Sequence, residues 1–321
     1  MNPLRPRALP PRATIGIWAP SGALPDVSAL GAAVSRLEGL GHRVVVAPGA
    51  EERDGYFAGS ALTRLRGLRT LVDDPTIDLV MAARGGFGLS HLLPDIDWAA
   101  CAASGKLFCG FSDFTAFHLG LFAQTGQISI AGPMACSDFQ GEIISTLHAE
   151  HFWGWISQSG EGRHTYPAWE SDQGAACAGR AAQQRISGTL WGGNLTMLAH
   201  LVGTPWFPVI DDGILFIEDI GETPYRLERA LMQLALAGIL ARQQAIITGA
   251  FTACTPAPHA GAHYTVEDVL AATRARFAGP VLTGLAFGHV RDKLALPFGA
   301  RAELFLDGAR CQLSVSPQLR A

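Results

Sequence analysis

The sequence predicts an α/β protein with two parts, an N-terminal domain built on a mostly parallel, doubly wound sheet and a C-terminal mixed α/β domain with a β-hairpin. Short apolar runs alternate with helical periodicity in the first half, which is typical of βαβ units. The alternation stops in a polar stretch rich in Gly and Ala, and it resumes afterwards. We therefore expect an N-terminal domain over residues 13–155, a linker over 156–185 and a C-terminal domain over 186–321.

Composition narrows the classes of function. The chain has 321 residues, of which 48% are hydrophobic and 16% charged, enough for about two buried cores. A formal net charge of −4 without long basic runs argues against a nucleic-acid partner. No apolar run approaches the ~18 residues that span a bilayer, so we expect no membrane partner. The start lacks the apolar core of a secretory signal and the six cysteines form no C-x-x-C, which favours a cytoplasmic protein with reduced thiols.

In the first half, strands and helices are expected in alternation. The glycine stretch 84–88 and Ser112 both follow predicted strands, and ligand sites of parallel sheets lie beyond such carboxyl ends. The two segments are therefore expected at one edge of the sheet. The expected elements are a strand within 14–22, a helix within 27–41, a strand within 42–49, a helix over 61–72, strands within 77–86 and 106–111, a helix over 115–124 and a strand within 127–133.

The second half mixes strands, turns and helices. In the segment 213–238 a strand and a turn precede a helix, for which Thr223 fits the N-cap, Pro224 the first helical position and Gly238 the end. Alternating residues on both sides of Asp307-Gly308 predict a β-hairpin over 302–315. The other expected elements are a Gly-Gly turn entering a helix within 189–208 and strands within 245–251 and 281–289.

Ser112 lies on a tight turn between a strand and a helix, in the stretch GFSD. One interpretation is that Ser112 or Asp113 simply caps the helix, since caps are far commoner than nucleophiles before an apolar run. The alternative is a nucleophile beside unpaired backbone N–H groups that stabilise an oxyanion. The spacing is G-x-S-D and not the G-x-S-x-G of hydrolase elbows, so the stretch alone leaves both interpretations open.

Two further residues are candidates for chemistry. Glu218 and Asp219 end an apolar strand, where a carboxylate either interacts with the following helix N-terminus or orients a histidine. His289 follows a predicted strand and a glycine. The order Ser112, Glu218, His289 suits a nucleophile, an orienting acid and a base, although order says nothing about geometry.

Metal and nucleotide sites are not favoured. The histidine pairs in HAEH (148–151) and HAGAH (259–263) lack the H-E-x-x-H spacing of a zinc site. The turn RGGFG (84–88) matches neither G-x-G-x-x-G nor G-x-x-x-x-G-K-[ST], so a tight turn is the simpler interpretation. The motifs therefore favour neither a zinc site nor a bound nucleotide.

Seven segments, taken together and in order, resemble the LD-carboxypeptidase family, which comprises muramoyltetrapeptide carboxypeptidases and the related microcin-immunity peptidases. The resemblance covers nearly the whole chain, from about residue 13 to residue 305. It is carried by GIWAPSG, ARGGFGLSHLLPDIDW, CGFSDFTAFHLGLFAQTG, AGPM, WGGNLTMLAHLVGTPW, LFIEDIGETPYRLERALMQLALAG and FGHVRDKLALPFGARAEL.

The resemblance implies a serine peptidase without metal or cofactor, in which Ser112 is the nucleophile, Glu218 the acid and His289 the base. It also implies an oxyanion hole formed by the backbone N–H groups of Asp113 and Gly86. The family is typically a homodimer, with the active site between the N-terminal and C-terminal domains.

The leading hypothesis for the reaction is removal of the terminal D-Ala from murein tetrapeptides, an L,D bond, during cytoplasmic peptidoglycan recycling. An alternative enzyme is a microcin-immunity-like hydrolase of peptidyl-nucleotides. A protein of another class, a two-domain small-ligand binding protein, has the same architecture.

Two positions depart from the family pattern, and two arginines are candidates for substrate binding. Phe111 stands where Tyr often precedes the serine, and Trp191 stands where an aliphatic residue is usual, which suggests stacking on an aromatic substrate group. A carboxypeptidase must recognise a free carboxylate, for which arginine is suited. Arg84 in the glycine turn and Arg291 after His289 are the candidates, with Arg84 favoured.

Overall fold

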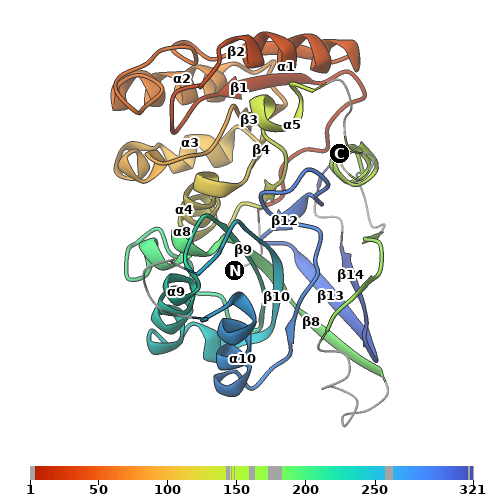
Figure 1. The fold of residues 1–321 in the computed structure, drawn as a ribbon. Coiled ribbons are helices and arrows are strands. Elements are labelled where there is room, and N and C mark those ends of the chain that lie inside the picture. The colour runs from red at the N-terminus through yellow and green to blue at the C-terminus, as the bar shows by residue number, and fades with distance from the viewer. Residues whose placement is uncertain are drawn as a thin grey trace.

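The computed structural model describes residues 4–141, 145, 147, 149–158, 163–172, 183–256, 263–316, 319 and 320. Apart from one late strand, two sheets with their covering helices follow one another along the chain, as Figure 1 shows in red to yellow and in green to blue. The first sheet is mostly parallel and the second is mixed, which confirms the predicted fold class. The domain boundaries stay a prediction.

The first sheet has the strand order β12-β5-β4-β3-β1-β2. Helix α1 (Ser28–Gly39) packs on α5 (Ala135–Asp138). Helix α3 (Trp98–Ala103) packs on both α2 (Ala61–Asp73) and α4 (Thr115–Thr125), so the sheet is doubly wound. The chain reverses its direction of travel across the sheet between β1 and β3, and a ligand crevice is expected beyond the carboxyl ends of strands near such a point. The strands are β1 (Thr14–Trp18), β2 (Arg43–Val46), β3 (Leu79–Ala82), β4 (Leu107–Gly110), β5 (Ser129–Ala131) and the antiparallel β12 (Leu296–Phe298).

Helices α1, α2 and α4 form at the predicted positions, whereas α3 and α5 were not predicted. Helix α4 is a long buried element directly behind Ser112, and it ends at a left-handed Gly126. The helices are α1 (Ser28–Gly39), α2 (Ala61–Asp73), α3 (Trp98–Ala103), α4 (Thr115–Thr125) and α5 (Ala135–Asp138), with short turns η1 (Leu89–His91), η2 (Leu93–Asp95), η3 (Ser112–Phe114), η4 (Ala149–Trp153) and α7 (Gly154–Ile156).

The second sheet has the order β11-β10-β9-β8-β13-β14-β6, and β7 also pairs with β14. No helix in the described ranges combines the length and the apolar run needed to cross a bilayer. The strands are β6 (His164–Thr165), β7 (Trp169–Glu170), β8 (Gln183–Asn194), β9 (Gly213–Ile220), β10 (Gln243–Thr252), β11 (Val281–Leu282), β13 (Arg301–Asp307) and β14 (Arg310–Val315). The helices are α8 (Leu195–Leu201), α9 (Pro224–Leu236), η5 (Leu240–Arg242) and α10 (Val266–Arg276).

Three local expectations differ from the structure. The segment expected as a linker contains β6 and β7, which add to the second sheet through β14. The strand expected within 281–289 ends at Leu282. The hairpin forms as predicted, but its paired ends are Asp307 and Arg310, so the turn lies one residue later than expected.

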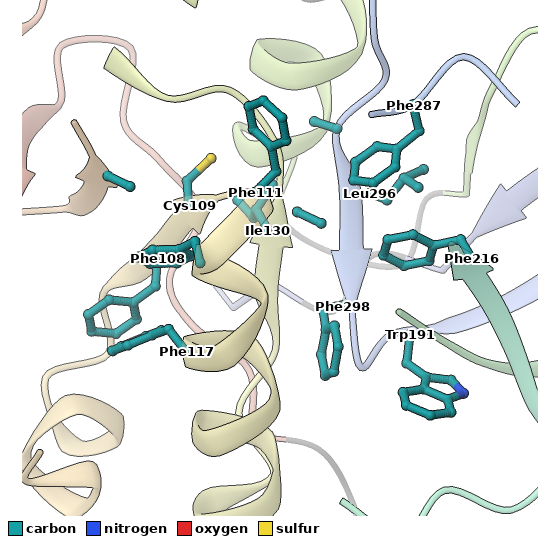
Figure 2. Close-up of a cluster of buried hydrophobic side chains, with 14 of the residues drawn as sticks. Phe108, Cys109, Phe111, Phe117, Ile130, Trp191, Phe216, Phe287, Leu296 and Phe298 are labelled. Carbon is teal, nitrogen blue, oxygen red and sulfur yellow. The ribbon is translucent and has the colours of Figure 1, made fainter. Parts of the chain in front are cut away.

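One apolar core joins the two sheets. Strand β12 comes late in the sequence yet pairs with β5 of the first sheet. Its Leu296 and Phe298 lie between Ile130 on one side and Phe216 and Phe287 on the other, as Figure 2 shows, and all five are buried. Burial of this kind stabilises by about 25 cal/mol per Å² of apolar surface and fixes the packed elements relative to one another. The core therefore holds the carboxyl ends of β4 and β9 in a defined relation.

Gly192 tests the packing of the second sheet. Its φ is +143°, and a Cβ there would lie 1.8 Å from the Phe216 carbonyl oxygen. We expect Gly192→Ala to lower the free energy of unfolding by about 3 kcal/mol, because both strain and a backbone clash must be relieved. Chemical denaturation measures this loss.

Gly31 in α1 provides the control, because it is exposed and a Cβ there would contact nothing within 4 Å. Gly31→Ala should leave stability unchanged or raise it by up to ~1 kcal/mol. Equal unfolding free energies for the two variants would contradict this account of the sheet.

Candidate active site

Ser112 lies on a strained turn between β4 and α4. Its φ is +62°, in the left-handed region that a side chain rarely adopts. The glycine turn packs directly on it, since a Cβ at Gly85 would lie 2.9 Å from both Cβ and Oγ of Ser112. Helix α4 begins after Phe114, and no side chain caps its N-terminus. Neither Ser112 nor Asp113 is therefore the cap of this helix. The geometry is that of an elbow presenting a hydroxyl.

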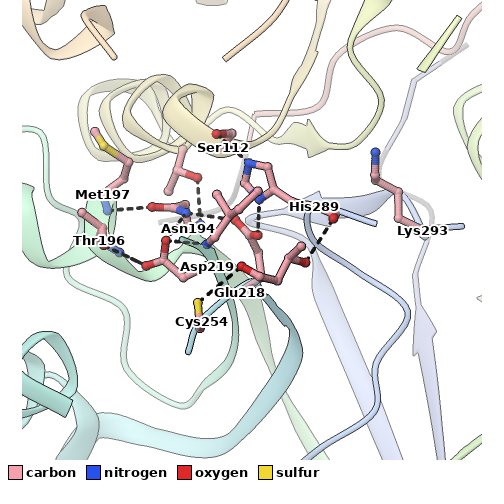
Figure 3. A network of polar contacts seen from close by, with 12 residues as sticks. Ser112, Asn194, Thr196, Met197, Glu218, Asp219, Cys254, His289 and Lys293 are labelled. Atoms are coloured by element: carbon pink, nitrogen blue, oxygen red, sulfur yellow. Dashed lines mark hydrogen bonds and ion pairs between the residues drawn. The ribbon is translucent and has the colours of Figure 1, made fainter. Parts of the chain in front are cut away.

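Glu218 and Asp219 point in opposite directions at the end of β9, as expected for neighbours in a strand. Glu218 faces the elbow, whereas Asp219 turns to the start of α8. Asp219 accepts hydrogen bonds from Thr196 N at 2.9 Å, Thr196 Oγ1 at 2.8 Å and Asn194 Nδ2 at 2.9 Å. Asp219 therefore secures a helix N-terminus, and Glu218 is left for the site (Figure 3).

His289 lies in a loop between β11 and β12, not at a strand end. The loop nevertheless runs alongside β10. Ala250 N donates to Phe287 O at 2.9 Å, and Thr252 Oγ1 donates to His289 O at 3.0 Å. The register of β10 against its neighbour β9 shifts between Thr248 and Phe251, so the pairing along this strand is irregular. Gly288 then lets the loop approach β9, since a Cβ there would lie 3.0 Å from Glu218 Oε2.

Ser112, His289 and Glu218 form a chain of two hydrogen bonds, although they come from three distant segments (Figure 3). Ser112 Oγ lies 3.0 Å from His289 Nε2, and His289 Nδ1 lies 2.6 Å from Glu218 Oε2. Glu218 is fully buried, and Asn194 Nδ2 donates to its other oxygen at 3.2 Å. A buried carboxylate favours the proton on Nδ1, which leaves the Nε2 lone pair free to accept the hydroxyl proton.

A cleft of about 760 Å³ opens at these residues. Ser112 and His289 lie on its wall together with the glycine turn, and its lining draws on both halves of the chain. Arg84 and Arg291 line it, as does Gly86, whose φ is +110°. The sequence-predicted residues of the glycine turn, the elbow and the histidine loop therefore meet at one cleft.

Lys293 and Asp138 also line the cleft, and sequence reasoning missed both. They form a nearly buried ion pair between the histidine loop and α5. The Lys293 ammonium lies 4.3 Å from the centre of the Phe111 ring, and that ring lies 4.9 Å from the His289 ring. The position of Asp138 past the carboxyl end of β5 is the one signal that could have indicated it.

Trp191 does not fit the predicted stacking on a substrate. Its side chain is 1% exposed, its Nε1 donates to Gln243 Oε1 at 2.7 Å, and its ring packs edge-on against Phe207. Trp191 is absent from the lining of the cleft. A side chain enclosed in the core of the second sheet offers no face to a substrate.

The two histidine pairs are described only in part. His148 and His259 lie outside the described residues, and His151 contacts His164 at 3.2 Å between ring nitrogens. Burial lowers the pKa of His164 to about 4. In the described part of the chain, no three His, Cys, Asp or Glu side chains are arranged to hold a metal ion.

Comparison with known proteins places this chain in a family. The model of the LD-carboxypeptidase N-terminal domain matches residues 15–132, and that of the LD-carboxypeptidase C-terminal domain matches residues 187–304. The murein tetrapeptide carboxypeptidase of Pseudomonas aeruginosa is 33% identical over 303 residues, which cover 90% of this chain and 92% of that protein.

Solved structures of the same family have a similar fold. The muramoyltetrapeptide carboxypeptidase of Oxalobacter formigenes superposes with a TM-score of 0.83 at 40% identity, covering 94% of this chain and 99% of the other. The microcin C7 self-immunity protein MccF, in complex with aspartyl sulfamoyl adenosine, gives a TM-score of 0.87 at 27% identity, covering 99% and 100%. With both domain models matched in order and this similarity over almost the whole length, the chain is a serine-type carboxypeptidase and belongs to the LD-carboxypeptidase family.

Proposed function

We propose that this chain removes the C-terminal D-Ala from murein tetrapeptides by a Ser112–His289–Glu218 triad. The observation that carries the proposal is the hydrogen-bonded chain from Ser112 Oγ through His289 to Glu218, on a serine with φ of +62°. The names of the relatives support the substrate class. By the same resemblance, the enzyme acts as a homodimer in cytoplasmic peptidoglycan recycling.

In the first half of the reaction, His289 Nε2 takes the proton of Ser112 as Oγ attacks the scissile carbonyl carbon. The carbonyl oxygen gains a negative charge, and the collapsing tetrahedral intermediate expels the D-Ala amine, which receives the proton from His289. The Glu218 carboxylate accepts the hydrogen bond from His289 Nδ1 and stabilises the imidazolium. A water then attacks the acyl carbon and gives its proton to His289 Nε2. Ser112 Oγ leaves and receives that proton, which frees the tripeptide with a new carboxylate. No redox step is needed.

The backbone N–H groups of Gly86 and Asp113 are the proposed oxyanion hole. Asp113 N lies 3.5 Å from the position of a Cβ at Gly85, so the glycine turn and the elbow face each other closely. Such donors act on the charge that develops in the transition state, where they contribute most.

Arg84 is the proposed reader of the substrate carboxylate. Its Nη1 donates to the Ala23 carbonyl at 2.6 Å, which fixes the guanidinium. Its Nη2 lies 3.5 Å from the position of a Cβ at Gly86, beside the proposed oxyanion hole. A fixed guanidinium on the cleft wall suits recognition of a carboxylate. Arg291, on the same wall, is the second candidate.

The reaction is tested by mass spectrometry of a murein tetrapeptide incubated with the protein. We expect release of D-Ala and the tripeptide, and a loss in kcat on the order of 10⁴–10⁶ in Ser112→Ala, because the nucleophile is gone. The folded state should persist, as measured by circular dichroism.

Two further assays test the alternative functions, one with a peptidyl-nucleotide as substrate and one that measures ligand binding. The structural likeness to the MccF complex makes a peptidyl-nucleotide the second candidate substrate. Cleavage of that compound and not of the tetrapeptide would reverse the choice of substrate. Binding of the tetrapeptide without turnover by the wild type would mean a ligand-binding protein.

Glu218 and Asp219 are separated by conservative substitutions. Glu218→Gln should lower kcat on the order of 10⁴-fold, because the amide supports the wrong tautomer of His289. Asp219→Asn should lower kcat less than about tenfold, because it acts on the N-terminus of α8. Steady-state kinetics at one pH decide this. A larger kcat loss in Asp219→Asn would reverse the two roles.

Arg84→Met tests the reading of the carboxylate. For a free-acid peptide we expect kcat/KM to fall about 10- to 100-fold, as for loss of a charged hydrogen bond of about 1.5–3 kcal/mol. We expect the wild type to cleave a C-terminally amidated analogue poorly, and the kcat/KM for that analogue should fall little further in Arg84→Met. Arg291→Met is the matched comparison on the same cleft. If only Arg291→Met shows the discriminating loss, Arg84 is not the reader.

A further inference from the structure

Asp113 carries a buried carboxylate that the proposed reaction does not use. It follows Ser112 directly and its side chain is 1% exposed. Its Oδ2 accepts hydrogen bonds from Ser21 Oγ at 2.6 Å and from Leu89 N at 3.0 Å. Its Oδ1 is buried and has no hydrogen-bond partner in the described part of the chain. Burying a carboxyl group costs free energy that hydrogen bonds must offset, and only one of its two oxygens has such bonds here.

The partners of this carboxylate come from two other strand ends. Ser21 lies in the loop that follows β1, and Leu89 directly follows the glycine turn at the end of β3. Gly22 N donates to Gly85 O at 3.4 Å, which joins the same two loops. The Asp113 carboxylate therefore links the carboxyl ends of β1, β3 and β4, where the predicted crevice lies.

Arg64, on α2, binds the loop after β1 and the glycine turn. Its side chain is 3% exposed, and its Nη1 donates to the carbonyls of Pro20 at 2.7 Å and Gly88 at 2.8 Å. Burial raises the pKa of the Asp113 carboxyl, and the bonds from Ser21 and Leu89 together with the Arg64 charge oppose that rise. A buried cation and a buried carboxylate thus both bind the C-terminal end of the glycine turn and the loop that follows β1.

We propose that the Asp113 carboxylate is a positioning residue that holds the glycine turn against the elbow, so that the N–H groups of Gly86 and Asp113 point at one oxyanion. This inference rests on the proposed serine chemistry. The two donors sit on separate loops, and an error of about 1 Å between them can cost on the order of 100-fold in rate. The carboxylate fixes their separation through Leu89 N, three residues after Gly86.

The test compares affinity for a tetrahedral analogue with ordinary substrate binding. The probe is a peptide that ends in a boronic acid in place of the scissile carbonyl. In Asp113→Asn the backbone N–H stays, so only its placement changes. We expect kcat to fall about 10- to 100-fold, KM to change little and the Kd of the boronate to rise by the same factor as kcat falls.

Two further variants keep the test decisive. Ser21→Ala removes one hydrogen bond to Oδ2, and it should shift kcat and boronate Kd in the same direction by a smaller factor. It decides the question if Asp113→Asn does not fold. Asp78→Asn is the control, because Asp78 Oδ2 accepts from Thr14 N at 2.8 Å at the opposite edge of the same sheet. It should lower the melting temperature and leave boronate affinity unchanged.

Unchanged boronate affinity in Asp113→Asn and Ser21→Ala, or an equal loss in Asp78→Asn, would overturn the positioning role. If the wild type itself does not bind the boronate, the serine chemistry fails, and the positioning role fails with it. Binding by the wild type together with unchanged variants overturns the role of Asp113 alone.

Discussion

The proposed chemistry depends on the hydrogen bond between Ser112 Oγ and His289 Nε2. This bond is 3.0 Å long and joins residues 177 positions apart, one behind a strand of the first sheet and one in a loop of the second part. A proton passes over this distance only if the two parts keep a fixed relation. The shared apolar core around β12 supplies that rigidity, because β12 leads directly from the histidine loop into the first sheet.

The backbone is strained at Ser112, where the loops converge. Ser112 has a positive φ, and Gly85 and Gly288 sit where a Cβ would collide with Ser112 or Glu218. Left-handed backbone at a residue with a side chain costs about 1–3 kcal/mol and persists only when its surroundings fix it. Here the fixing groups are buried: the Asp113 carboxylate beside the elbow, and Asn194 and Asp219 beside Glu218. The site is preorganised by polar bonds placed behind it.

Local pattern predicted much of this architecture, and long-range pairing explains what it missed. Periodicity and glycine punctuation predicted α4 and the turn before it, because both are decided by neighbouring residues. Strand β12 escaped prediction, because three residues including Pro297 carry no strand signal of their own and pair with a segment far away in sequence. Lys293 and Asp138 were missed for the same reason, since 155 positions separate them. Burial of Trp191 likewise depends on Phe207 and Gln243, which periodicity does not relate to it.

The central claim is that Ser112 is a nucleophile because His289 and Glu218 activate it across the two parts of the chain. Covalent labelling by a fluorophosphonate, followed by peptide mapping of the adduct, measures this most directly. The account predicts a single adduct on Ser112 and a labelling rate that falls at least about 100-fold in His289→Ala, as expected for loss of a general base. An adduct on another residue, or an undiminished labelling rate without His289, would contradict it.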